Sequence, residues 1–431
     1  LSPIPTASRG MSRIDPIHIA LLPSSGMGHL TPFLRLAASL VASGVTVTFV
    51  APYPTVSLAE SQALSCFFSD FPQVVPRRLD LLPVGEDCRS TDDPFYHHFD
   101  VIRRSCRLLG PILSLASPPL SAIVTDMSLV SAALPITEEL ALPNYVFFTS
   151  SAKMFTLFAS YHRLVESRSN CNTANLGHDF VGIPGRHPIS AEWLPRLLRD
   201  EGTNFFKSYF IENGKSATKA RGIIINTFGG FERETLEDLT DTKMFPGFPP
   251  LFAVGPLPQV LNKNCNVLAW LDNQEPSSVI YISFGSRTAI TKGQLKELGN
   301  GLVRSGCRFL WTVKSKKVDE EDRGNIDDLL GHDITEIMRR RGLVVKEWVD
   351  QNKILGHKSI GGFLSHCGWN SVMEAAWHGV PILAWPQHGD QNVVPGEAIA
   401  EKIQDVLKNN QMELRAQATR IKESARRSTV A

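Results

Sequence analysis

The stretch IHIALLPSSGMGHLTPFLRLAASLVASGVTVTFVAP, residues 17–52, combines the patterns of a strand, a helix and a second strand. The apolar run 17–23 is typical of a buried strand, and residues 30–44 repeat apolar side chains at helical spacing before stopping at Gly44. Residues 45–52 are again rich in β-branched side chains. A strand, a crossover helix and a second strand form the βαβ unit from which parallel sheets are built. The stretch therefore predicts the α/β fold class.

The same rhythm occurs twice along the chain, once on each side of a segment rich in Pro and Gly at 244–260. Further strands of the first half are predicted at 121–126, 144–150 and 221–228, and the second half opens with the strand 277–286. A Pro/Gly-rich segment between two such series is typical of a linker between domains. Two α/β units with parallel sheets would then face each other, with a ligand cleft at the carboxyl ends of their strands.

The composition fits a folded protein of two domains and excludes several classes of function. The chain has 431 residues, 43% of them hydrophobic and 20% charged, and a net charge of +1. Such a balance gives no general attraction to nucleic acid or to an anionic membrane. No apolar run is long enough to span a bilayer. Seven cysteines without a CxxC pair indicate reduced thiols in the cytoplasm and no zinc site.

The glycine-rich loop after the first strand does not fit a dinucleotide site. Gly26 and Gly28 are followed by Thr31 where the third glycine of the fingerprint belongs. The second strand ends in FVAP and supplies no carboxylate for a ribose. A Rossmann oxidoreductase is therefore not predicted.

This loop instead carries a histidine that could act as a general base. The partial positive charge at a helix start favours the neutral imidazole of His29. Asp126 ends the predicted strand 121–126 at the same sheet edge, where a carboxylate can orient an imidazole. Taken alone, His29 is equally compatible with a capping or packing role, and Asp126 with a helix cap. No G-x-S-x-G nucleophile motif occurs, so such a base would act on a substrate.

In the second half, SHCGWNS (365–371) stands between a predicted strand and a predicted helix. The backbone amides of Asn370 and Ser371 and the side chain of His366 could therefore meet a diphosphate at a helix N-terminus.

Residues 348–391 read WVDQNKILGHKSIGGFLSHCGWNSVMEAAWHGVPILAWPQHGDQ. Over its whole length this segment resembles the signature box of the plant UDP-dependent glycosyltransferases that act on small molecules. The loop GHLTP and the turn YISFGS extend the resemblance over nearly the whole chain. It implies the GT-B fold, two facing Rossmann-like domains with parallel sheets and an interdomain cleft. The implied parts are an acceptor-binding domain at 1–245, a linker at 246–265, a UDP-sugar-binding domain at 266–410 and a C-terminal helix at 411–431 that packs back on the first domain.

The resemblance also implies roles for individual residues in holding the donor. Trp348 would stack on uracil, and Gln351 and Glu374 would bind the ribose. His366, Asn370 and Ser371, in the segment SHCGWNS, would hold the phosphates. The implied UDP-binding residues are Ser286, Trp348, Val349, Gln351, His366, Gly368, Asn370, Ser371 and Glu374. The implied sugar-binding residues are Gly28, Thr149, Ser150, Trp369, Asp390 and Gln391, the last being the family's usual mark of glucose.

One segment departs from the family pattern. After GDQ at 389–391 the family continues through a further segment before its next helix, whereas here NVVPGEAIAEKI follows at once. The departure affects the wall of the implied sugar-binding site next to Asp390 and Gln391.

The predicted reaction is a single displacement with inversion at the anomeric carbon, with His29 and Asp126 as the catalytic pair and no metal or other cofactor. Phe95, Tyr96 and Phe99 could line a slot for a planar acceptor, although packing in the core accounts for them equally well. Three segments resemble the flavonoid C-glycosyltransferase branch more closely than the common O-glucosyltransferases. They are residues 93–114, the glycine-rich loop with GHLTP, and the part of the signature box from LSHCGWNS to GDQ. We therefore expect C-glucosylation of a flavonoid or related polyphenol by a cytoplasmic, monomeric enzyme whose partners are a UDP-sugar and a small aromatic acceptor. The alternatives are O-glucosylation of phenolic hydroxyls and a nucleotide-sugar-binding protein without turnover.

Overall fold

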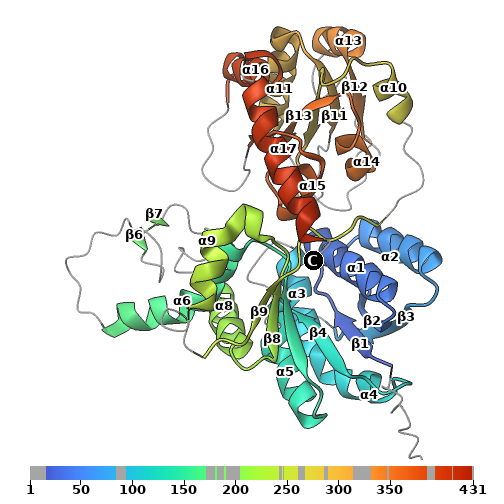
Figure 1. Cartoon of the computed structure of the whole chain (residues 1–431), viewed down its shortest axis with the longest axis vertical. Coiled ribbons are helices and arrows are strands. Elements are labelled where there is room, and N and C mark those ends of the chain that lie inside the picture. The colour runs from blue at the N-terminus through green and yellow to red at the C-terminus, as the bar shows by residue number, and fades with distance from the viewer. Residues whose placement is uncertain are drawn as a thin grey trace, which may run out of the picture.

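Two parallel sheets, one in each half of the chain, organise the molecule in the computed structural model (Figure 1). The structure describes residues 16–83, 94–170, 180–181, 189–190, 204–241, 245, 247–260, 267–285, 290–313, 332–346, 349–385, 394–409 and 411–429.

The first sheet has seven strands in the order β3-β2-β1-β4-β5-β8-β9, and all its neighbours are parallel. Its strands are β1 (His18–Leu22), β2 (Thr46–Tyr53), β3 (Val75–Asp80), β4 (Ala122–Asp126), β5 (Asn144–Phe148), β8 (Gly222–Ile225) and β9 (Leu251–Ala253). The strand order reverses between β1 and β4, which makes a crevice at their carboxyl ends the expected ligand site. The stretch 246–265, predicted as a linker, contributes β9 to this sheet.

Helices cover both faces of the first sheet, so successive residues of its strands are buried against different clusters. Leu21 packs with Phe33 of α1 on one face, whereas Ala20 and Leu22 pack with Ile102 on the other. The covering elements are α1 (Met27–Ala42), α2 (Leu58–Asp70), α3 (Pro94–Ser105), η2 (Cys106–Leu108), α4 (Leu109–Ser114), η3 (Met127–Leu129), α5 (Val130–Glu139), α6 (Ala152–Asn170), α8 (Asn204–Ala217) and α9 (Gly229–Thr240). β6 (Phe180–Val181) and β7 (Ile189–Ser190) form a separate antiparallel pair. Burial on both faces explains why the central strands β1, β4 and β5 are nearly continuous apolar runs.

The second sheet has five parallel strands in the order β12-β11-β10-β13-β14. They are β10 (Val279–Ser283), β11 (Arg308–Thr312), β12 (Gly342–Val345), β13 (Ile360–Ser365) and β14 (Ile382–Ala384). Its helices are α10 (Leu268–Asp272), α11 (Lys292–Ser305), α13 (His332–Arg341), α14 (Gln351–Leu355), α15 (Trp369–His378) and α16 (Gly396–Gln404), followed by η5 (Asp405–Asn409) and α17 (Gln411–Ser428). The order reverses between β10 and β13, so a second switch point lies where the turn 365–369 leads into α15. The predicted α/β class with two parallel sheets is confirmed.

The last helix joins the two halves. α17, drawn in red in Figure 1, runs from the C-terminal half toward the first sheet and packs on α15 and α9. Ala425 of α17 is fully buried in a cluster with Phe228 of the first half and with Met373 and Ala376 of α15.

Helix α1 begins at Met27, three residues before the predicted helical run. Its N-cap is Gly26, whose φ of 93° is open to glycine, and no side chain caps the helix. The backbone N–H of Gly26 instead donates to the buried Glu60 carboxylate of α2. His29 consequently lies within the first turn of α1 rather than ahead of it.

Candidate active site

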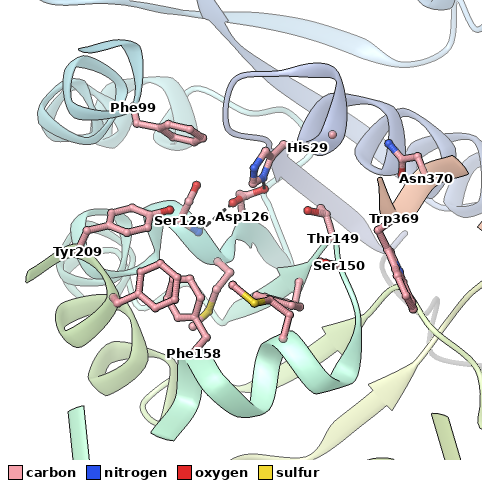
Figure 2. Close-up of a pocket in the computed structure, with 15 residues that line it drawn as sticks. His29, Phe99, Asp126, Ser128, Thr149, Ser150, Phe158, Tyr209, Trp369 and Asn370 are labelled. Carbon is pink, nitrogen blue, oxygen red and sulfur yellow. Dashed lines mark hydrogen bonds and ion pairs between the residues drawn. The ribbon is translucent and has the colours of Figure 1, made fainter. Parts of the chain in front are cut away.

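His29 of α1 and Asp126 at the end of β4 form a hydrogen-bonded pair where the strand order of the first sheet reverses. Nδ1 of His29 lies 2.8 Å from Oδ2 of Asp126, and the Asp126 side chain is 1% exposed (Figure 2). The other carboxylate oxygen, Oδ1, accepts a 2.8 Å hydrogen bond from the backbone N–H of Ser128. Both oxygens of Asp126 are therefore held, and the orientation of the carboxylate fixes the imidazole.

This geometry sets the tautomer of His29. An ionised carboxylate accepts hydrogen bonds and cannot donate one, so Nδ1 of the neutral ring carries the proton. The lone pair then lies on Nε2, the nitrogen on the far side of the ring from Asp126. The His29 side chain is 32% exposed, whereas the Asp126 side chain is buried. The arrangement is that of a general base with a buried orienting carboxylate.

A cavity of about 360 Å³ opens beside this pair, within the range of small-molecule sites. It is lined by Gly28, His29, Phe99, Asp126, Met127, Ser128, Phe148, Thr149, Ser150, Met154, Phe158, Tyr209, Phe210, Trp369 and Asn370. Thus Gly28, Phe99, Thr149, Ser150, Trp369 and Asn370 share one cavity with the His29–Asp126 pair, as Figure 2 shows for all but the first of them.

Five aromatic rings from the described part of the first half line the cavity, those of Phe99, Phe148, Phe158, Tyr209 and Phe210. The ring of Phe99 meets the His29 ring edge-on at 5.6 Å between centroids, and lies 6.4 Å from the ring of Tyr209. Phe158 and Phe210 are stacked at 3.9 Å. Such a wall suits a flat aromatic ligand held with one edge at His29.

Sequence reasoning missed seven lining residues, which are Met127, Ser128, Phe148, Met154, Phe158, Tyr209 and Phe210. A signal existed for some of them. Phe148 lies near the end of the predicted strand 144–150, and Met154 and Phe158 are spaced four apart on the helix that follows it. Tyr209 and Phe210 belong to α8 and lie just beyond the segment 171–205, whose Gly, Pro and Asn content is typical of a long loop.

The start of α15 forms the opposite side of the cavity. No side chain caps this helix, and Gly368 is its N-cap, so its first N–H groups are available to an anion. Nε1 of Trp369 donates to the backbone oxygen of Asn226 at 2.6 Å, and Nδ2 of Asn370 donates to the backbone oxygen of Met27 at 3.2 Å. Both bonds join the C-terminal half to the N-terminal half.

The imidazole of His366 lies between two glycines that approach it closely. A Cβ atom added to Gly285 or to Gly368 would meet Nε2 of His366 at 2.6 Å or 2.4 Å. A side chain at either position would displace the His366 ring from this orientation, so the two glycines leave room for the imidazole.

A polar cluster lies one helical turn further along α15. Nε2 of Gln351 is 2.7 Å from Oε2 of Glu374 and 3.0 Å from Oγ of Ser371. Glu374 and Ser371 are each only 6% exposed. Val349, which precedes this cluster, packs half-buried against the second sheet's core.

Several predicted site residues cannot be placed. Ser286, Trp348, Asp390 and Gln391 lie outside the described residues, as do the side chains of Phe95 and Tyr96.

Within the described part of the chain, no group of three or more His, Cys, Asp or Glu side chains is arranged to hold a metal ion. No described helix is both long and apolar enough to cross a membrane.

The chain matches one family model and is similar in sequence to known proteins over most of its length. Residues 255–412 match the family model "UDP-glucoronosyl and UDP-glucosyl transferase". UDP-glycosyltransferase 708G2 of Citrus unshiu is 47% identical over 442 aligned residues, covering 95% of this chain and 92% of the relative. UDP-glycosyltransferase CGT of Oryza sativa subsp. japonica is 45% identical, covering 88% of this chain and 80% of the relative.

Among solved structures, the chain is similar to LpCGTa crystallised in complex with UDP. The two share 42% sequence identity and superpose with a TM-score of 0.83, over 96% of this chain and 95% of the other.

Proposed function

The chain belongs to the UDP-glycosyltransferase family, with its GT-B fold, and from this premise we propose that it transfers glucose from UDP-glucose to an aromatic carbon of a flavonoid or related polyphenol. The observation that carries the proposal is the His29–Asp126 pair in the lining of a cavity that it shares with several aromatic rings. A base in that position faces the edge of a planar acceptor, where phenolic hydroxyls lie.

In the proposed reaction, Nε2 of His29 removes a proton from a phenolic hydroxyl. The resulting negative charge is shared between the phenolate oxygen and the ring carbon ortho to it. That carbon attacks the anomeric carbon of glucose, a C–C bond forms, and the bond from the anomeric carbon to UDP breaks with inversion. The attacked ring carbon then releases its proton to solvent, which restores an aromatic phenolate. The phenolate oxygen takes back the proton held by the His29 imidazolium, so one proton leaves in total and the neutral base is regenerated.

The buried Asp126 makes this base effective. As the imidazolium forms, the carboxylate 2.8 Å from Nδ1 stabilises its positive charge and keeps the ring in place. A protein that only bound a nucleotide sugar would need neither the pairing nor its opening into a cavity.

The donor is proposed to lie along the start of α15. The first N–H groups of that helix and the His366 imidazole would hold the diphosphate and stabilise departing UDP. Gln351 and Glu374, which already bond to each other, would bind the ribose. Trp348 is assigned to uracil, and Ser286 to the phosphates.

The sugar is proposed to sit between the two halves. Gly28, Thr149, Ser150 and Trp369 line the cavity shared with His29, and Asp390 and Gln391 would read the glucose hydroxyls. The proposed steps need no metal, because helix N–H groups supply the charge stabilisation at the phosphates.

Carbon as the acceptor atom is supported by two relatives. The rice relative is named CGT, and LpCGTa carries the same letters for C-glycosyltransferase. Transfer to the phenolic oxygen is the competing outcome, because deprotonation makes the oxygen as well as the ortho carbon nucleophilic.

Acid stability of the product separates the two. The enzyme is incubated with UDP-glucose and a phloroglucinol-type acceptor, and the isolated glucoside is heated in acid and analysed by mass spectrometry. We expect the glucoside to survive and to fragment across the sugar ring, because a C–C bond is not hydrolysed. Release of the intact aglycone would establish O-glucosylation instead.

A further inference from the structure

A buried ion pair links the two halves at the donor side of the cleft. The guanidinium of Arg35, on α1, donates through Nη2 to Oε1 of Glu374, on α15. Each side chain is only 8% exposed. The second oxygen of Glu374, Oε2, accepts from Nε2 of Gln351 at 2.7 Å. Both oxygens are thus engaged, one by each half of the molecule.

Glu374 needs a positive partner in this position. A carboxylate removed from water and left unpaired is costly, and the group is held charged only by an opposite charge and hydrogen bonds. The site proposed for UDP is moreover anionic when filled, so an uncompensated Glu374 would repel the donor. Arg35 cancels this charge.

Arg35 also limits how the Glu374 side chain can turn. With Oε1 held by α1 and Oε2 held by α14, the carboxylate plane is fixed from two directions. An ionised carboxylate oxygen has more than one acceptor site, so Oε2 can accept from Gln351 and from a hydroxyl at once.

We propose that Arg35 is a positioning residue for donor recognition, holding Glu374 so that Oε2 is presented to the ribose hydroxyls of the UDP-sugar. The inference rests on the proposed function, in which Glu374 binds the ribose. It adds that the N-terminal half, through α1, sets the geometry of a group in the C-terminal half. α1 carries His29 as well, so one helix supports both the base and the ribose contact.

Nucleotides that lack one ribose hydroxyl test this directly. Affinities of UDP, 2′-deoxy-UDP and 3′-deoxy-UDP are measured by titration calorimetry for the wild type, R35M, E374Q and R304M. In the wild type, at least one deoxy nucleotide should bind about 10-fold more weakly than UDP, the usual effect of losing a hydrogen bond to a charged group. In R35M and in E374Q this ratio should fall below about 3-fold.

R304M is the matched control, because Arg304 of α11 forms an exposed ion pair with Glu397 of α16, and neither residue belongs to the proposed donor site. It should keep the wild-type ratio. A merely structural role of Arg35 would weaken all three nucleotides equally and leave the ratio unchanged, and that result would overturn the proposal.

The double variant R35M/E374Q covers the case in which R35M does not fold. Replacing both charges together leaves no unpaired buried ion. If Arg35 acts through Glu374, the double variant should bind UDP within about 3-fold of E374Q alone. A further loss of about 10-fold in the double variant would overturn the inference, since Arg35 would then act independently of Glu374.

The roles of Arg35 and of Glu374 can be contradicted separately. If E374Q loses the discrimination and R35M keeps it, Arg35 has no positioning role while the ribose role of Glu374 stands. If the wild type binds UDP without discriminating any ribose hydroxyl, the proposed donor role of Glu374 fails, and the inference with it.

Discussion

Asp126 holds His29 with one carboxylate oxygen and the Ser128 backbone with the other. In D126N, the amide group that replaces Oδ2 can donate to Nδ1 of His29, which moves the ring proton to Nε2 and removes the lone pair from the substrate side. We expect kcat to fall by about 10²–10⁴-fold, the usual range for a general base. UDP affinity should stay within about 3-fold, because Asp126 is proposed to act only on the acceptor side.

H29A is the comparison for this prediction. It should lose about as much activity as D126N, and the double variant little more than either, because the two residues act as a unit. Steady-state kinetics with a saturating acceptor measure the effect. D126N with kcat near that of the wild type would show that His29 is not the base or does not need its carboxylate.

The residues around this pair differ in how far the sequence could predict them. Asp126 ends β4, and His29, Thr149 and Trp369 follow the carboxyl ends of β1, β5 and β13. Strand ends in α/β proteins can be predicted from apolar runs, and they mark the ligand side of the sheet. Arg35 gives no such signal. It reads as one polar position of an amphipathic helix, and its partner lies 339 residues away.

At the scale of single elements, the carboxyl end of α15 is sensitive to pH. His378 is the last residue of this helix, and its Nε2 is 2.5 Å from Oδ1 of Asn352. Burial lowers the pKa of His378 to about 4; Glu374 acts in the opposite direction, and Lys422 and Arg426 of α17 add to the lowering. A helix C-terminus alone would favour the charged imidazole, so burial is the stronger effect here.

This shift makes folding stability depend on pH. Below the ordinary histidine pKa of about 6.5, the unfolded chain takes up a proton that the folded chain does not. The stabilising contribution of the neutral, buried His378 to the free energy of unfolding is therefore complete above about pH 6.5. It is lost as the pH falls toward 4. Allowing for partial exposure, the free energy of unfolding should fall by about 1 kcal/mol between pH 6.5 and 5.

H378Q removes the titrating group and should flatten this dependence. Urea unfolding of the wild type and H378Q at about pH 7.5 and about pH 5 compares the two slopes. Equal losses of stability in both proteins would mean that His378 is not the group responsible.

Element boundaries show where local patterns stop being informative. The sequence predicts the helix of α1 but starts it too late, because its N-cap is a glycine without a capping side chain and the loop is held by Glu60 of another helix. This error arises where tertiary contacts decide the element.

For the whole molecule, the two parallel sheets were predictable and the contacts between the halves were not. Strand and helix periodicity repeat on each side of the Pro/Gly-rich segment, so the count of α/β units follows from the sequence. The bonds Trp369–Asn226, Asn370–Met27 and Arg35–Glu374 join residues 143, 343 and 339 positions apart. No periodic pattern links such positions, so the facing arrangement of the two units could be expected from the sequence but the individual contacts between them could not.

The last helix should contribute to holding this arrangement together, since Ala425 of α17 is buried between Phe228 of the first half and Met373 of α15. A425D places an unpaired carboxylate in that cluster, which should lower the free energy of unfolding by about 3 kcal/mol and weaken UDP binding, because α15 loses its support. A416D makes the same change at an exposed position of the same helix and should stay within about 0.5 kcal/mol of the wild type. Urea unfolding and UDP titration of the two variants separate the packing of α17 from its helical propensity. Equal stability and equal UDP affinity in A425D and A416D would show that α17 does not brace the two halves through Ala425.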